Sequence, residues 1–517
     1  MPIEREFVFR ALLQHNFLPF TRPNKEELPP LFTSASFSEQ ATLALDALAL
    51  RQHGKGYDQL DYKLTRFNGV TRVLSIPHPH PYAKLCKKIN DNWQHLSFIT
   101  ENPNSKIFPE PHDDGRIIIM TGYGGPIHKA HSELNRAFGK RFRVSTDIVN
   151  CFPSVYSHAI PWALVGLDFA KQNRGHAEWF NQIDKAVRDC KRGETQGIAI
   201  GPATSNIISE CIFARIDEAL RTEFEFVRFI DDYICYCETE DQALNFVRRL
   251  EQEAAKFKLH LNARKTELVR LPQPTVAPWL IELADRQPTE NASSMEVFRY
   301  LDFAVQLSEK YPDSSVLKYA ATAIDNAGHF LFETVNPINY LLSIAFHRVE
   351  ILPLLSKQLE NAYMRSGENF HDVTGVNDKL IQILRENVKY QRSDGMAWSL
   401  YHLGRFDVPI ELQLAETVLN TTDPLAISAL YWGYQQFRPQ VIAYCQSLDT
   451  NDLYELDKHW LLLYQVFLDG GITNPYQDQV FETLQQHQVT FMMDKQQLQP
   501  EVQEQFDFGV DELFALR

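Results

Sequence analysis

The most constraining feature of the sequence is a pair of aspartates between two short apolar runs, VRFIDDYICYC at residues 227–237. β-Branched and aromatic residues are frequent on both sides of Asp231 and Asp232, which favours two strands joined by a tight acidic turn. Residues 141–149 (RFRVSTDIV) also have the alternation and the β-branched content of a strand. The pattern therefore predicts a hairpin with two carboxylates at its tip and a further strand ending in Asp147.

Two helices and two returning strands complete this part of the chain. The spacing predicts a helix over 205–223, with Thr204 or Ser205 as its N-cap, and a second helix over 242–257 capped by Asp241. The apolar row of the first helix recurs at every fourth residue: Ile208, Ile212, Ile216 and Leu220. The runs LHLN (259–262) and ELVRL (267–271) have strand character. This mixture predicts an α+β domain.

The second half of the chain has a different pattern. Proline-rich residues 272–279 (PQPTVAPW) have the composition of a linker, and helical periodicity dominates after them. The string D-x-x-A-x-S occurs at Asp394 and again at Asp423, 29 residues further on, which is roughly the interval at which stacked helix pairs repeat. We therefore expect a domain at 1–271, a linker at 272–279 and an all-α, repeat-like domain at 280–517.

Charge is distributed unevenly along the 517 residues, whose net charge is −15. Residues 1–271 hold 35 Lys and Arg against 33 Asp and Glu, whereas residues 272–517 hold 16 against 33. Affinity for duplex DNA depends on neutralising phosphates with Lys and Arg. The acidic second half is therefore a poor surface for gripping a duplex, whereas the near-neutral first half leaves room for a local basic groove.

Cysteine usage and hydropathy predict a cytoplasmic protein. The seven cysteines are scattered and form no CxxC pair, which fits a reducing compartment better than a disulfide framework or a zinc site. The sequence has no run of about eighteen apolar residues, so we expect no membrane span. The charged N-terminus MPIEREFVFR differs from a signal peptide.

Three carboxylates fall where strands are predicted to end, namely Asp147 and the pair Asp231 and Asp232. Nucleotidyl transfer uses two divalent metal ions bridged by carboxylates. Mg²⁺ is usually held by one or two protein carboxylates together with water and phosphate oxygens. The plain alternative is a solvated turn, because most Asp-Asp pairs have no other role, and a short motif needs its context.

The neighbouring motifs supply that context. In chain order the sequence shows DIVNCFPSVYSHAIPW, GIAIGPATSNIISE, FIDDY and LHLNARKTELVRL, which resemble palm motifs A to D of reverse transcriptases. IPHPHPYAKLCKKINDNW resembles the fingers segment of the bacterial enzymes. SHAIPW, AKQNRG and GIAIGP resemble the abortive-infection (Abi) group of phage-defence reverse transcriptases. The resemblance covers about residues 68–271. It implies an α+β palm and fingers, followed by an all-α, HEAT-like C-terminal domain.

The resemblance also implies roles for individual residues. Asp147 and Asp231 match the two metal-ligating aspartates and Asp232 the third carboxylate, so the expected cofactor is Mg²⁺ in a two-metal site. Lys265 matches the motif D lysine, a cation that neutralises or protonates the leaving pyrophosphate; the alternative is a surface lysine. Phe152 matches the aromatic steric gate that excludes a 2′-hydroxyl and so selects deoxynucleotides; the alternative is a core phenylalanine.

The predicted nucleotide loop departs from the family pattern. Gly201 matches the glycine of the P-Q-G motif, where a small residue lets the backbone approach a nucleotide. Ile200, however, stands where the family has glutamine. That glutamine helps to position nucleotide and template, so Ile200 argues against templated copying and leaves the metal chemistry intact. Arg116, in HDDGRIIIM, is our candidate for the fingers residue that grips the triphosphate.

The Abi resemblance implies a template-independent, protein-primed DNA polymerase that works as a homo-oligomer and arrests phage-infected cells. Its partners would be dNTPs and a single-stranded DNA product attached to the chain. Priming needs an exposed hydroxyl near the metals, and Tyr57, Tyr62 or a serine of residues 34–38 are candidates. Two alternatives stay open: a templated reverse transcriptase that works with a noncoding RNA, and a non-enzymatic binding protein on a polymerase fold.

Overall fold

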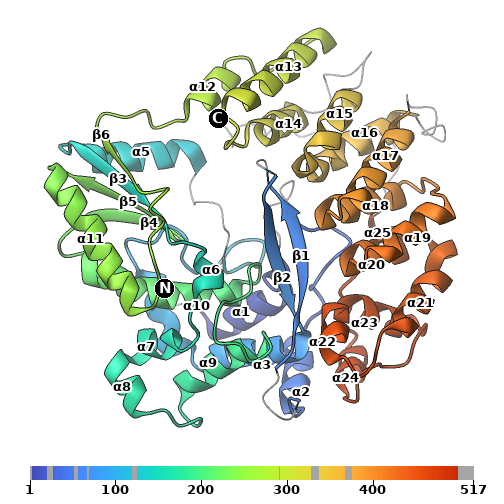
Figure 1. Cartoon of the computed structure of the whole chain (residues 1–517), viewed down its shortest axis with the longest axis horizontal. Helices are drawn as coiled ribbons and strands as arrows, with labels where there is room; N and C mark the ends of the chain where they lie inside the picture. Colours follow the sequence, from blue (N-terminus) through green and yellow to red (C-terminus); the bar gives the residue numbers. More distant parts are fainter. Residues whose placement is uncertain are drawn as a thin grey trace.

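The computed structural model describes residues 3–19, 27–51, 56–66, 69–118, 125–289, 292–327, 337–366 and 375–498. Figure 1 shows a mixed group of helices and strands on one side, the helices of the second half on the other, and a long hairpin between them. None of the described helices is long and apolar enough to cross a membrane.

The first half contains a four-stranded antiparallel sheet with the strand order β4-β5-β3-β6. Its strands are β3 (Phe142–Thr146), β4 (Glu225–Phe229), β5 (Asp232–Cys237) and β6 (Glu267–Arg270). β4 and β5 form the predicted hairpin, with Phe229 paired to Asp232 across the turn. Thr146 pairs with Tyr233, so the residue that follows β3 lies beside the tip of the hairpin.

Two long helices accompany this sheet, as the α+β prediction requires. They are α10 (Ala203–Leu220) and α11 (Glu240–Lys256). α11 packs on β3 and β5, whereas α10 packs against α11 and α7 (Ala159–Val165). α10 is buried on all sides along most of its length, which explains why small and apolar residues occur all round it.

The predicted caps of both helices are wrong. α10 begins at Ala203, and its N-cap is Pro202, whose side chain offers no acceptor, rather than Thr204 or Ser205. The reason is that the loop before α10 is held by backbone hydrogen bonds, including Ala203 N to Asn16 O at 2.9 Å. Thr239 caps α11 by accepting a hydrogen bond from a backbone N–H. Asp241, the predicted cap, lies inside the first turn of that helix.

The predicted strand over 259–262 is also wrong, because the chain turns there instead. Lys258 has a left-handed φ of 66°, and the segment makes a single bridge between Leu261 and Ile148. Asn262 N donates to Asp147 O at 2.8 Å, and Lys265 N donates to Asn262 O at 3.1 Å. This turn brings Lys265 to the end of β3.

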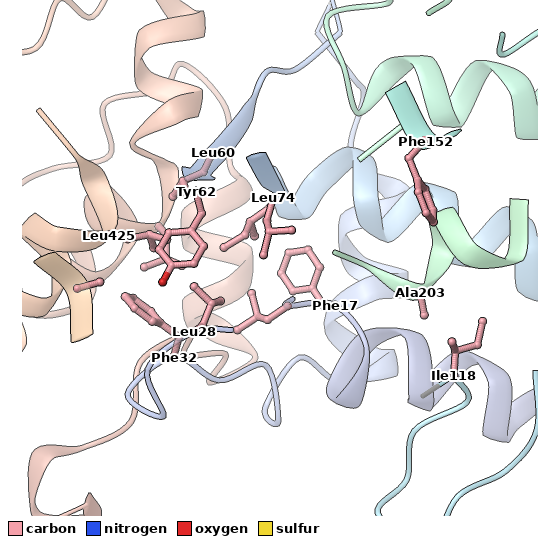
Figure 2. Packing of buried hydrophobic residues seen from close by; sticks show 14 of the residues in the cluster. Phe17, Leu28, Phe32, Leu60, Tyr62, Leu74, Ile118, Phe152, Ala203 and Leu425 are labelled. Carbon is pink, nitrogen blue, oxygen red and sulfur yellow. The ribbon is translucent and has the colours of Figure 1, made fainter. Parts of the chain in front are cut away.

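A second sheet consists of the hairpin β1 (Gln59–Thr65) and β2 (Thr71–Pro77). α3 (Pro79–Asp91) follows it. Tyr62 is paired with Leu74 across the hairpin, and both side chains are buried. Figure 2 shows Tyr62 in the same apolar cluster as Phe32 from the N-terminal segment and Leu425 from the second half. The two halves therefore share one hydrophobic core.

From Pro278 onward the described elements are helices, which confirms the predicted helical second half. The longer ones are α13 (Ser294–Lys310), α14 (Val316–Ala327), α15 (Ile338–His347), α16 (Ser356–Ser366), α17 (Val376–Lys389), α18 (Ser393–Arg405), α20 (Pro424–Gly433) and α21 (Arg438–Ser447). The echo at Asp394 and Asp423 marks the starts of α18 and α20, which pack against each other. A HEAT-like succession stays a prediction.

The second half packs back onto the hairpin at both ends of β1. Asp394 of α18 accepts hydrogen bonds from Thr65 N at 2.5 Å and from Thr65 Oγ1 at 3.0 Å. Asp457 of α22 (Leu453–Lys458) accepts two bonds from Arg51, each at 2.7 Å, and one from Asp58 N at 2.8 Å. Residues 272–277 form neither helix nor strand. The domain limits at 271 and 280 stay a prediction.

Candidate active site

Three carboxylates and one lysine meet at the end of the four-stranded sheet. Asp147 follows β3 and is buried, Asp231 lies in the β4–β5 turn, and Asp232 begins β5. Lys265 Nζ donates to Asp147 Oδ2 at 2.6 Å. Asp147 Oδ1 is buried and has no hydrogen-bond partner among the described residues. The structure thus brings together the four residues that the sequence motifs selected.

The electrostatics of this cluster suit a divalent cation. Burial, followed by the negative charges of Asp232 and Asp147, raises the pKa of Asp231 to about 6, although Lys265 opposes the change. The hydrogen bond to Asp147 raises the pKa of Lys265, so its ammonium stays charged at neutral pH. Carboxylates that repel one another and a buried acceptor without a donor are both stabilised by a bound cation.

The arrangement is not a closed metal cage. Within the described ranges, no three histidine, cysteine, aspartate or glutamate side chains converge tightly enough to hold an ion. Asp147 faces Lys265 instead, and Asp232 is exposed. A magnesium site at Asp147, Asp231 and Asp232 is therefore a proposal that the chemistry of the donors supports.

The turn that carries the two aspartates is strained. Ile230 has a φ of 60°, a left-handed conformation that β-branched residues rarely adopt and that costs on the order of 1–3 kcal/mol. Arg228 Nη1 donates to Ile230 O at 2.7 Å. The motif analysis missed Arg228, because a single arginine in a strand has no pattern of its own.

Phe152 lies in the short helix α6 (Cys151–Ser154), which follows Asp147 after a left-handed residue, Asn150, with a φ of 46°. Its side chain is only 6% exposed. Its carbonyl accepts a hydrogen bond from Ile198 N at 3.0 Å, which joins this helix to the loop at 197–201. The burial agrees with either a gate or a core residue, and the gate stays a prediction.

The loop at 197–201 is packed against the N-terminal segment and the hairpin. Gly201 has a φ of 139°, and a Cβ built on it would lie 2.8 Å from Pro19 Cβ, so a larger residue does not fit there. Ile200 O accepts a hydrogen bond from Ser75 N of β2 at 2.8 Å. The position at which the family has glutamine is thus fixed by its backbone to the hairpin.

Arg116 is buried, and its Nε donates to Asp114 Oδ2 at 2.8 Å. Arg116 also forms an ion pair with Asp114 within its own loop. A role in gripping a triphosphate stays a prediction for this residue.

Comparison with protein-family models matches residues 71–310, from β2 through α13, to reverse transcriptase (RNA-dependent DNA polymerase). The chain contains a reverse transcriptase domain. All four residues of the cluster lie within the matched range. This domain makes the protein an enzyme of the nucleotidyltransferase class, a DNA polymerase of the reverse-transcriptase type. No curated protein is matched.

Among solved structures, the chain is similar to two structures of telomerase from Candida tropicalis. An apo telomerase truncated from its C-terminal domain is 14% identical, over 47% of this chain and 57% of that chain, with a TM-score of 0.30. A telomerase in complex with the TWJ fragment of telomeric RNA is 12% identical, over 73% of this chain and 69% of that chain, with a TM-score of 0.32. With scores this low, neither structure bears on template, substrate or partner.

One further cation, Arg66, approaches the site from the hairpin, with Arg72 beside it, and the motif analysis missed both. Burial, followed by Arg72, lowers the pKa of Arg66, while Glu27 and Asp231 oppose that change. The guanidinium of Arg66 is therefore within electrostatic range of Asp231. Arg66 directly follows β1, and Arg72 lies on β2. Only the pairing of these strands could have pointed to them.

Among the priming candidates, Tyr57 and Tyr62 are wrong because their side chains are buried, whereas Ser36 and Ser38 are half-buried and stay a prediction. Tyr57 is 1% exposed, and its Oη lies 2.9 Å from His80 Nδ1. Tyr62 is fully buried and donates to Glu27 O at 3.0 Å. The serines at 34, 36 and 38 all make hydrogen bonds within the fold. Their polar neighbourhood in the sequence suggested a surface segment, but the second half of the chain covers part of it.

Proposed function

We propose that the cluster at Asp147, Asp231, Asp232 and Lys265 is the active site of a DNA polymerase that uses deoxynucleoside triphosphates. The meeting of these four residues at one end of the sheet carries the proposal. Asp147 and Asp231 would hold two Mg²⁺ ions, with Asp232 as the third carboxylate. When bound, Mg²⁺ stabilises the negative charge that develops on the attacking and leaving oxygens.

The remaining chemistry belongs to side chains of this protein. The ammonium of Lys265 neutralises the leaving pyrophosphate or gives it a proton. Phe152 closes the space under the sugar and so rejects a 2′-hydroxyl. Arg66 and Arg72, whose hairpin approaches the acidic turn, bind the triphosphate and orient it. Charge-assisted contacts from arginine suit phosphate oxygens because the guanidinium donates two N–H groups side by side.

We propose further that synthesis needs no template. Two observations support this. Ile200 lacks the amide of the family's glutamine, and its backbone is bonded to Ser75. The segment that follows the palm, residues 278–327, holds 4 Lys and Arg against 8 Asp and Glu, so it is a poor grip for a duplex.

The remaining parts of the proposal rest on the resemblance to the Abi group. They are priming on a hydroxyl of the protein, a single-stranded DNA product attached to the chain, a homo-oligomeric state, HEAT-like repeats and action against phage in the cytoplasm. The priming residue stays unassigned.

The test is incorporation of each labelled dNTP by purified protein with Mg²⁺ and no added nucleic acid, followed by denaturing electrophoresis before and after protease digestion. Label that migrates with the protein and is released as DNA by protease supports untemplated, protein-primed synthesis. Incorporation that begins only after an RNA template and a primer are added overturns the untemplated mechanism and supports templated copying. An Asp231→Ala variant that still incorporates label would show that the cluster is not the active site.

A further inference from the structure

The backbone turn that presents Asp231 and Asp232 depends on a buried arginine. Ile230, immediately before the two aspartates, is held in the left-handed region. The carbonyl of this strained residue accepts a hydrogen bond from Arg228 Nη1 at 2.7 Å. A turn held open in this way returns to an ordinary conformation when its external partner is removed.

Arg228 is itself rigidly anchored, with a side chain that is 0% exposed. Its Nη1 and Nη2 donate to the two carboxylate oxygens of Glu210 at 2.7 and 2.9 Å. Its Nε donates to Asp217 Oδ2 at 2.9 Å, and Nη2 lies at the same distance from that oxygen. With the bond to Ile230 O, the guanidinium donates four hydrogen bonds.

The two carboxylates are fixed by the helix that carries them. Glu210 and Asp217 lie two turns apart on α10, on the same face of the helix, and both are buried. Asp217 also accepts hydrogen bonds from Asn102 Nδ2 at 2.7 Å and from Tyr233 Oη at 3.0 Å. Through Arg228, the position of the turn is therefore fixed relative to α10, the longest described helix of the reverse transcriptase domain.

The backbone of Arg228 is clamped as well. Its N–H donates to Asn104 O, and its carbonyl accepts from Lys106 N, both at 2.8 Å. The residue can therefore neither slide along β4 nor rotate away from the turn. Within the described part of the chain, its hydrogen bond towards the active site is the one to Ile230 O.

We propose that Arg228 is a positioning residue: it transmits the fixed geometry of α10 to Ile230 O and so holds Asp231 and Asp232 where catalysis requires them. This inference rests on the catalytic role proposed for the two aspartates. It assigns to the buried network of Arg228, Glu210 and Asp217 a function beyond stabilising the core. A displacement of about 1 Å at a reacting centre costs on the order of 100-fold in rate.

The test compares Arg228→Lys with a matched control, Tyr233→Phe, in the full chain. Lysine keeps the charge but lacks the fork that reaches both the carboxylates and Ile230 O. Tyr233→Phe removes one hydrogen bond from the same Asp217 and leaves Ile230 O untouched. For Arg228→Lys we expect a kcat about 100-fold lower with little change in KM for dNTP. We also expect weaker Mn²⁺ binding in electron paramagnetic resonance titrations of the protein without nucleotide. Tyr233→Phe should lower only the unfolding midpoint.

A second pair of variants keeps the inference testable should Arg228→Lys fold poorly. Glu210→Gln loosens one anchor of the guanidinium at constant volume, and we expect the same split between kcat and KM with a smaller fall. Ile230→Gly accepts a positive φ without strain, so adding it to Glu210→Gln should restore part of the lost kcat. Activity losses that follow the unfolded fraction alone, or no rescue by Ile230→Gly, would overturn the inference.

Asp231→Ala, assayed in parallel, separates the two levels of the argument. If it abolishes incorporation while Arg228→Lys and Glu210→Gln keep the wild-type kcat and Mn²⁺ affinity, the positioning role fails and the proposed function stands. If Asp231→Ala retains incorporation, the proposed function fails and the positioning role fails with it.

Discussion

At the scale of single residues, Lys265 combines an exposed side chain with an ammonium placed on a buried carboxylate oxygen. Lys265→Ala should slow the incorporation step by about 100-fold or more, since a positioned acid contributes about 10²–10⁴. Lys265→Arg keeps the positive charge but cannot release a proton, so it separates neutralisation from proton donation. The measurement is the single-turnover rate as a function of pH. A wild-type rate for Lys265→Ala would rule out both roles.

Phe152 permits a test of sugar selection. Phe152→Ala should lower the preference for dATP over ATP by about 10- to 200-fold, the range that one apolar contact can supply. Because the ring is buried, the same change should cost about 3–5 kcal/mol of stability, and Phe152→Leu is the milder companion. The measurement is the ratio of kcat/KM for the two nucleotides. An unchanged ratio in folded protein would identify Phe152 as a core residue only.

The residues of the candidate site differed in how far the sequence could reveal them. Asp147, Asp231 and Lys265 lie next to strands and turns whose alternation is visible locally, and the chain order of the motifs supplied the rest. Arg66 lies near Arg72 across the hairpin and near Asp231 of the β4–β5 turn, far along the chain. No local sequence pattern therefore identifies it. Arg116 was chosen from a motif-like setting; the structure shows its ion pair with Asp114, and its role stays a prediction.

At the scale of elements, helices α18 and α20 approach each other closely at Gly404 and Gly433. A Cβ built on Gly404 would lie 2.8 Å from Gly433 Cα. In an isolated helix Gly404→Ala should gain up to about 1 kcal/mol, but here we expect a loss of about 1–3 kcal/mol because the helices must separate. Urea unfolding measures this. Gly175→Ala, at a site with nothing within 4 Å, should be close to neutral; similar values for the two variants would contradict the close packing.

Helix and strand existence was predictable at this scale, whereas helix ends were not. The apolar row through Ile208 and Ile216 defines α10 whatever surrounds it. Its start at Ala203 depends on Asn16, which lies almost two hundred residues earlier in the chain and bonds the loop before the helix. In the same way, the strand expected over 259–262 gave way to a turn that is fixed by Asp147.

At the scale of the whole molecule, Asp394 joins the two halves through a carboxylate that is 2% exposed. Burial raises its pKa to about 6, against 3.8 for the free side chain, although Thr65 and Gly395 donate to it. The folded state therefore binds the proton more tightly, and this contribution to stability is lost as pH rises through about 6. Relative to wild type, Asp394→Asn should gain about 3 kcal/mol between pH 4 and pH 8. Denaturant unfolding across this range checks it, and parallel curves would contradict it.

The union of the halves was beyond reach from sequence. The loss of strand patterns after residue 271 predicted the change from a mixed to a helical part, and the described elements from Pro278 onward are helices. The bonds that join them span 329 residues between Thr65 and Asp394, and 399 between Asp58 and Asp457. Each of these bonds forms only when both halves are folded and bury the carboxylate. Amino-acid composition gives no information about which carboxylates become buried in this way.

The attachment of β1 at both of its ends has a thermodynamic consequence. Since Asp394 holds Thr65 and Asp457 holds Asp58, the hairpin that bears Arg66 cannot shift towards a nucleotide without displacing α18 and α22. A ligand that binds α18 or α22 and opposes this movement of the hairpin lowers the affinity for nucleotide by a certain factor. Linkage requires that the nucleotide weaken the binding of that ligand by the same factor. Ligand binding to the helical half and nucleotide binding at the polymerase site are thus coupled in both directions.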